Sequence, residues 1–265
     1  MIRRGYAPRV LVIPALLGVA FLVLPLAALV GRVEWGTLWA DITSVEALSA
    51  LRLSVITGLI ATAVCLVIGI PFALVIARAT PRVAALLRAI VTVPLVLPPM
   101  VGGLALLFLF GRSGWLGFTG WEVPFTTVAV VLAQIFVALP FLVLALEGAI
   151  RTSGLDYERT AAGLGAGNWT ILWRVTLPLA APGLISGTVL CFARAAGEFG
   201  ATALFAGNAP GVTQTMPLAI YTAFNGAGVS QGAAIALSLM LLVTSVAVLL
   251  LVRGWRPAHV VEAER

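Results

Sequence analysis

The chain has 265 residues, of which 61% are hydrophobic and 10% charged, a composition outside the range of soluble globular domains. Its formal net charge is +6, and all sixteen basic residues are arginine. Phosphate-binding loops and Schiff-base enzymes both need a lysine, so the composition excludes these two chemistries. The single histidine, His259, lies near the C-terminus, which excludes histidine-based metal sites and Ser/His/Asp triads within the apolar part. We therefore expect no catalytic residues, no metal and no cofactor.

Six apolar stretches approach or exceed the length that a helix needs to cross a bilayer, about 20 residues. They lie near Val10 to Val30, Ser54 to Ala77, Ala89 to Phe110, Phe125 to Ala145, Leu179 to Leu204 and Ala233 to Val252. The sequence predicts an all-α integral membrane protein with six transmembrane helices, in one domain covering residues 1–265. The basic residues before the first stretch are typical of a signal peptide, but its apolar run is too long for a signal core, so we expect a retained helix.

The distribution of the arginines predicts the orientation of these helices. Twelve of the sixteen flank the stretches on the side of the two termini and of the segment from Ser153 to Pro178, whereas Arg32, Arg52 and Arg112 lie on the other side. By the positive-inside rule, both termini and that segment are cytoplasmic, in the plasma membrane of a bacterium or archaeon. The bias accounts for the basic isoelectric point without any nucleic-acid partner.

The polar segment from Ser153 to Pro178 is the longest hydrophilic segment on the arginine-rich side. We expect Asp156 to cap a first short helix and Asn168 to cap a second, with Gly165 and Gly167 in the turn between them. A folded polar loop in an otherwise apolar chain predicts a surface that docks another protein.

This segment resembles the EAA loop of the permeases of ATP-binding-cassette importers, although Arg159 and Thr160 separate the glutamate from the alanine pair. The residues that carry the resemblance are Glu158, Ala161, Ala162, Leu164, Gly165 and Ala166, followed by Leu177 and Pro178. The strings L-V-L-P-P-M-V-G-G, F-A-R-A-A-G-E-F-G-A-T and P-G-V-T-Q-T-M-P resemble the molybdate permeases of that family. Sulfate permeases share the core of the second string.

The resemblance implies a type I importer permease fold and a homodimer with the transport path on its two-fold axis. It further implies two copies of a cytoplasmic ATPase subunit, docked on the segment from Ser153 to Pro178 as the coupling loop, and an extracytoplasmic oxyanion-binding protein. The implied cargo is molybdate, with tungstate as its near equivalent. ATP hydrolysis then belongs to the separate subunit. Two alternatives stay open: the same machine carrying sulfate or thiosulfate, and a secondary transporter working alone. The second would need carboxylates inside several helices, whereas Glu198 is the one acid clearly buried in a predicted span.

Two features inside the predicted helices bear on the transport path. Pro94, Pro98 and Pro99, followed by Gly102 and Gly103, should break the third helix, either as a packing kink or as a bend in the path.

In the fifth helix, Arg194 and Glu198 lie four residues apart on one helical face, where charge is costly. They either satisfy each other internally or border the path near its gate, and we favour the second interpretation. The small residues Gly197 and Gly200 would let a facing helix approach closely, and Thr202 completes the predicted path segment.

Overall fold

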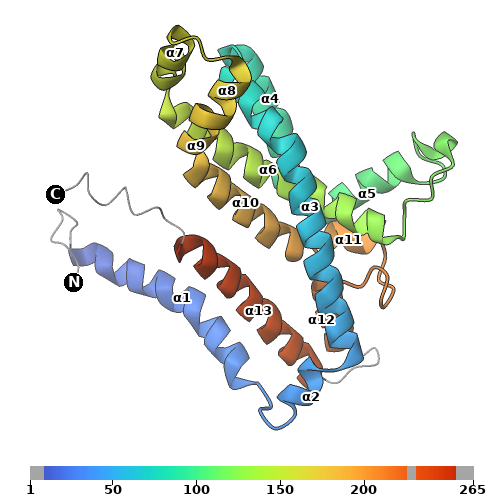
Figure 1. The fold of residues 1–265 in the computed structure, drawn as a ribbon. Coiled ribbons are helices and arrows are strands. Elements are labelled where there is room, and N and C mark those ends of the chain that lie inside the picture. Colours follow the sequence, from blue (N-terminus) through green and yellow to red (C-terminus); the bar gives the residue numbers. More distant parts are fainter. Residues whose placement is uncertain (1–8, 226–230, 255–265) are drawn as a thin grey trace.

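Three long helices run through the molecule without a break (Figure 1). The structure is a computed structural model that describes residues 9–225 and 231–254, and every regular element in these ranges is helical. The three long helices are α1 (Val12–Gly31), α3 (Val45–Arg78) and α6 (Thr127–Ser153), and each is long and apolar enough to cross a membrane. At 1.5 Å per residue, α3 is about 50 Å long, so it extends beyond a hydrocarbon core of about 30 Å.

Two further helix pairs are long and apolar enough to form a span only if each bent pair is counted as one. The chain bends by 109° between α4 (Pro81–Val96) and α5 (Pro99–Phe110), and by 73° between the segment Asn168–Leu179 and α10 (Ala181–Ala196). The first bend confirms the predicted break and places it at Leu97, which is extended because it precedes Pro98. The prediction of one continuous helix from Leu179 to Leu204 is wrong, since α10 ends at Ala196 and α11 (Gly200–Phe205) follows.

All six predicted spans coincide with helices, but the count of six transmembrane helices is not confirmed. The sixth helix, α13 (Gln231–Gly254), is apolar over the shorter range Gly232–Ala247 within the described residues. The remaining elements are short: η1 (Arg9–Leu11), α2 (Leu38–Ile42), η2 (Gly117–Thr119), α7 (Asp156–Gly163), α8 (Asn168–Ile171), the π-helical turn η3 (Leu172–Thr176), α9 (Leu177–Leu179) and α12 (Met216–Phe224).

The core is built around α6, which packs most extensively against α3 and α10. Small side chains make this close packing possible, because they allow the helix backbones to approach. Ala61 and Cys65 of α3, Ala138 of α6, and Cys191 and Ala195 of α10 form one fully buried cluster. A Cβ added to Gly187 would lie 3.3 Å from the Cα of Leu142, so α10 and α6 touch almost backbone to backbone.

The helix α1 has a different environment. It lies beside α13 at one side of the molecule, and none of its residues is buried (Figure 1). Its apolar side chains therefore need an apolar environment, either lipid or another chain. The two chain ends, residues 1–8 and 255–265, lie outside the described residues, so the predicted cytoplasmic location of the termini stays a prediction.

Candidate functional site

The loop between α6 and α10 forms two short helices at the end of the molecule where α3 ends and α4 begins (Figure 1). The first, α7, ends in a hydrogen-bonded glycine turn: the N–H of Gly165 donates to the carbonyl of Ala162, and the N–H of Ala166 donates to that of Ala161. Gly165 has a φ of +87°, which this turn requires and which glycine adopts without strain. The predicted pair of helices with a glycine turn is confirmed.

The predicted caps of these two helices are wrong. Each helix begins at the residue expected to cap it, so Leu155 and Gly167 occupy the cap positions and neither makes a side-chain cap hydrogen bond. Asp156 is instead in the first turn of α7, where its negative charge favours the helix N-terminus. Gly167 has the extended backbone that a cap position needs, which leaves Asn168 already helical.

Glu158 connects α7 to two other helical segments. Its Oε1 accepts a hydrogen bond from the hydroxyl of Thr176, at 2.7 Å, and another from the guanidinium of Arg78, the last residue of α3. Burial raises the pKa of this carboxyl, but the hydrogen bonds from Arg78 and Thr176 outweigh burial, so the pKa of Glu158 is lowered. Glu158 is therefore ionised at neutral pH and joins α7 to α3 and to η3 at the base of α10.

The tip of the loop is apolar and exposed. Leu164 is 85% exposed at the tip, Ala162 and Gly165 are exposed beside it, and Ala161 and Ala166 are half-buried. Trp169 of α8 is exposed as well and adds a large aromatic ring to this surface. Exposed apolar groups on a polar loop outside the predicted membrane spans are typical of a protein-docking surface.

The second part of the site is the gap between α10 and α11. Glu198 lies in this gap, beyond the end of the helix that carries Arg194, yet the two side chains form an ion pair with 2.5 Å between Nη2 and Oε2. Glu198 is only 1% exposed, and its other oxygen accepts a hydrogen bond of 2.8 Å from the N–H of Ala201. The pair thus holds the break in place, with the side chain of Arg194 28% exposed and that of Glu198 enclosed.

The start of α5, just after the break at Leu97, packs against the start of α11, just after the gap that holds Glu198. A Cβ on Gly200 would lie 3.0 Å from the Cβ of Pro99, and a Cβ on Gly103 would lie 2.6 Å from the carbonyl oxygen of Ala201. The expected close approach is therefore confirmed for Gly200, whereas Gly197 is exposed. Non-helical backbone at membrane depth is tolerated where protein buries it or where it lines a water-filled cavity, and here α5 and α11 cover each other.

Three buried side chains, one each in α6, in α11 and at the start of α12, have polar atoms without a hydrogen-bond partner. They are the hydroxyls of Thr202 and Thr215 and the amide of Gln134, considered within the described residues. An unpaired buried polar group costs about 1–3 kcal/mol, which water or a solute would relieve. Thr202 was predicted as a path residue, whereas sequence reasoning missed Gln134, since a single amide in an apolar helix gives no pattern.

A second buried acid was also missed. The helix α6 continues past Ala145 to Ser153, and this extension carries Glu147, which is 6% exposed. Its Oε1 accepts hydrogen bonds from Arg88, at 2.8 Å, and from Arg151, at 3.4 Å. Glu147 lies beyond the predicted span, so it does not contradict the statement about acids in the predicted spans, but it adds a second enclosed acid to the membrane helices.

Comparison with known proteins is consistent with this arrangement. Residues 69–257 match the family described as binding-protein-dependent transport system inner membrane component. The chain is 51% identical to the molybdenum transport system permease protein ModB of Mycobacterium bovis over 92% of each chain. It is 41% identical to ModB of Escherichia coli K12 over 70% of this chain and 83% of that one. It is 37% identical to the sulfate transport system permease protein CysW of Synechocystis over 75% of this chain and 74% of that one.

Solved structures show the same fold at low sequence identity. The MetNI methionine ABC transporter matches with a TM-score of 0.62 at 17% identity, over 78% of this chain and 95% of that chain. A bacterial alginate ABC transporter in complex with a pentasaccharide-bound periplasmic protein matches with a TM-score of 0.63 at 16% identity, over 92% and 91%. The fold is that of type I ABC importer permeases. The chain belongs to the family of inner membrane components of binding-protein-dependent transport systems.

Proposed function

We propose that this chain is the permease subunit of an ATP-driven importer of molybdate. The importer carries tungstate as well, because tungstate is nearly the same as molybdate in charge and shape. The observation that carries the proposal is the 51% identity to a molybdenum transport permease over 92% of both chains. The coupling loop and the paired breaks supply the two parts that such a subunit needs, a surface for a motor and movable elements within the membrane.

In this proposal, ATP hydrolysis belongs to a separate cytoplasmic subunit, two copies of which dock on a homodimer of this chain. The exposed surface around Leu164 is the docking surface, with Ala162 and Gly165 letting the partner approach closely. Both termini and the loop are cytoplasmic, as the arginine bias predicts. An extracytoplasmic oxyanion-binding protein delivers cargo on the other side; the fold is shared with an alginate transporter solved with its periplasmic protein.

Force would reach the membrane part through Glu158. Since this carboxylate bonds to both Arg78 and Thr176, a displacement of α7 by the motor is transmitted to the end of α3 and to the base of α10. The far end of α10 carries Arg194, whose partner Glu198 also accepts a hydrogen bond from the N–H of Ala201 and so ties α10 to the start of α11, which packs on α5. We assign these residues, with Gly197, Gly200 and Thr202, to the gate of the path, which opens when the two breaks separate.

Reconstitution tests the proposal. The chain is placed in proteoliposomes with candidate ATPase and binding-protein subunits, and uptake of labelled molybdate is measured with ATP, without ATP and without the ATPase. Uptake that requires ATP and the ATPase supports the proposal. Molybdate flux through the chain alone, or no uptake with any assembled ATPase, contradicts it.

The same machine carrying sulfate is the second candidate, because the chain is also 37% identical to a sulfate permease over three quarters of its length. Competition distinguishes the two. We expect excess sulfate to leave labelled molybdate uptake largely unchanged, whereas tungstate should compete. Strong competition by sulfate at a concentration similar to that of molybdate would assign the cargo to the sulfate class instead.

A further inference from the structure

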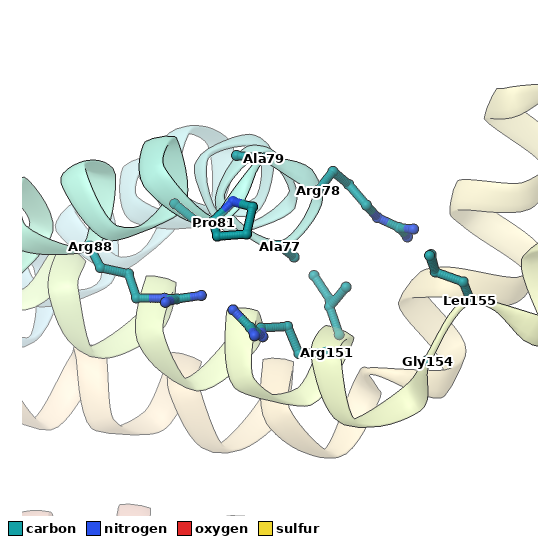
Figure 2. A pocket seen from close by; sticks show the side chains of 10 residues that line it. Ala77, Arg78, Ala79, Pro81, Arg88, Arg151, Gly154 and Leu155 are labelled. Carbon is teal, nitrogen blue, oxygen red and sulfur yellow. The ribbon is translucent and has the colours of Figure 1, made fainter.

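A pocket of about 330 Å³ lies where the end of α3, the start of α4 and the end of α6 meet. Three of its lining residues are arginines: Arg78, Arg88 and Arg151. Figure 2 shows the guanidinium groups of Arg88 and Arg151 pointing toward each other, whereas Arg78 points toward Leu155. None of its lining residues belongs to the exposed docking surface around Leu164 or to the proposed gate, although Arg78 also pairs with Glu158 of α7.

The pocket carries more positive than negative charge. Arg88 and Arg151 share a single carboxylate, that of Glu147. All the hydrogen bonds that the two arginines donate to this carboxylate go to its Oε1. The third arginine, Arg78, is neutralised by Glu158 of α7. One net positive charge therefore stays at the end of the pocket where two guanidinium groups converge.

The arginines keep donors available for a ligand. A guanidinium carries several N–H groups in a fixed plane, and only one nitrogen of Arg151 bonds to Glu147. The side chain of Arg151 is 54% exposed, so its other N–H groups can reach a ligand in the pocket. Like charges that converge repel each other, and an anion between them would remove this repulsion. Planar guanidinium groups match the oxygens of a phosphate group especially well.

Helix ends modify this field without reversing it. The N-terminus of α4 at Pro81 contributes partial positive charge, whereas the C-termini of α3 and α6 contribute partial negative charge. Full charges on the arginines exceed these partial charges. We infer that the pocket lined by Arg88 and Arg151 binds a phosphate group or a similar tetrahedral oxyanion. The group is either the headgroup phosphate of an anionic lipid or a soluble anion.

Thermal unfolding of the purified full-length chain tests this site and needs neither ATP nor cargo, so its outcome is independent of the proposed transport function. Inorganic phosphate, at constant ionic strength set with chloride, is the soluble probe. Phosphatidylglycerol mixed into neutral detergent micelles, compared with phosphatidylcholine, is the lipid probe. Stabilisation by phosphate assigns a soluble anion, and stabilisation by phosphatidylglycerol alone assigns a lipid headgroup. Either result supports the site.

The variant Arg151→Gln should bind the stabilising probe about fivefold more weakly, the factor expected for the loss of one basic contact near a membrane surface. Glu147 keeps its pairing with Arg88, so this variant folds. Arg151→Lys, which retains the charge, should recover part of the binding. Arg82→Gln removes an exposed arginine of α4 that does not line the pocket, and it should bind as the unmodified chain does. The inference is overturned if neither probe stabilises the chain, or if Arg151→Gln and Arg82→Gln respond alike.

Discussion

Arg78, the last residue of α3, donates a hydrogen bond to Glu158 in the first turn of α7. The ion pair joins a long helix of the membrane part to the first helix of the coupling loop. Its contribution to stability should be small, about 0.2–1 kcal/mol, because the guanidinium is partly exposed to water. In the proposed mechanism, this contact transmits a displacement of α7 to α3.

Replacing Glu158 with Gln should therefore separate coupling from folding. The amide keeps a hydrogen-bond acceptor but loses the charge that pairs with Arg78. The free energy of unfolding should therefore change by about 1 kcal/mol or less. We expect ATP hydrolysis in the assembled transporter to continue while molybdate uptake falls severalfold. Thr176→Val removes the second hydrogen bond to Glu158, and it should lower molybdate uptake as well. Full uptake per ATP in both variants would exclude Glu158 from force transmission.

The stability from this contact should depend on pH only in acid. The pKa of Glu158 is lowered in the folded chain, so the stabilisation is fully present above the ordinary pKa of glutamate, about 4.3, and is lost as pH falls through the lowered value. The difference in melting temperature between the unmodified chain and Glu158→Gln should be constant from about pH 5 to 8 and should shrink below about pH 4. A difference that disappears between pH 5 and 7 would contradict a lowered pKa.

Arg194 and Glu198, the proposed gate pair, should respond unequally to substitution. Arg194→Gln leaves the carboxylate of Glu198 enclosed without a counter-charge, which should cost about 3–5 kcal/mol. Glu198→Gln leaves a guanidinium that can reach water, and the new side chain can still accept from the N–H of Ala201, so the cost should be smaller. Thermal unfolding in detergent measures both.

Transport measurements on Glu198→Gln then address the gate itself. If the residue only orients helices, the folded variant should transport and hydrolyse ATP at the usual ratio. We expect altered uptake per ATP instead, since the charge that ties α10 to the start of α11 has been removed. Equal losses of stability in Arg194→Gln and Glu198→Gln would show that the carboxylate of Glu198 is not enclosed as the structure has it.

The close packing of the two breaks gives a further test. A methyl group at Gly103 would meet the backbone of Ala201, at 2.6 Å from its oxygen and 2.8 Å from its Cα, so Gly103→Ala should separate α5 from α11. Overpacking of this kind typically costs about 1–3 kcal/mol. Gly148→Ala is the matched control, because a Cβ on Gly148 of α6 would meet no described atom outside its own helix turn within 4 Å. This change should be neutral or slightly stabilising. Similar melting temperatures for the two variants would argue against tight contact at the breaks.

Features set by local chemistry were predictable from the sequence. The apolar stretches locate the helices, the prolines locate the break near Leu97, and the glycine turn of the coupling loop follows from Gly165. Each depends on residues that are neighbours in the chain.

Features set by distant contacts were not predictable. The break at Glu198 contains no proline, and it is stabilised by Arg194, by a bond to Ala201 and by packing of α11 on α5. Glu147 lies just beyond the apolar stretch, and its burial depends on Arg88 of another helix. The inward pairing of Glu158 likewise needs Arg78, which only the folded chain brings near.

The docking surface can be tested by removing its most exposed apolar side chain. Since Leu164 is 85% exposed, Leu164→Ala should leave the melting temperature of the isolated chain unchanged. In the assembled transporter the same change should weaken the association of the ATPase subunit about tenfold or more, as expected for an apolar anchor at the centre of an interface. Copurification and titration of the ATPase measure this loss.

Trp115→Ala is the control for that loss, because Trp115 is 86% exposed in the loop between α5 and α6, far from the coupling loop in the chain. It removes more apolar surface than Leu164→Ala does, so general loss of exposed apolar area would weaken association more in this control. We expect the ATPase to bind the Trp115 variant as tightly as the unmodified chain. Tight association of Leu164→Ala would show that the motor docks elsewhere, and Glu158 would then have no external force to transmit.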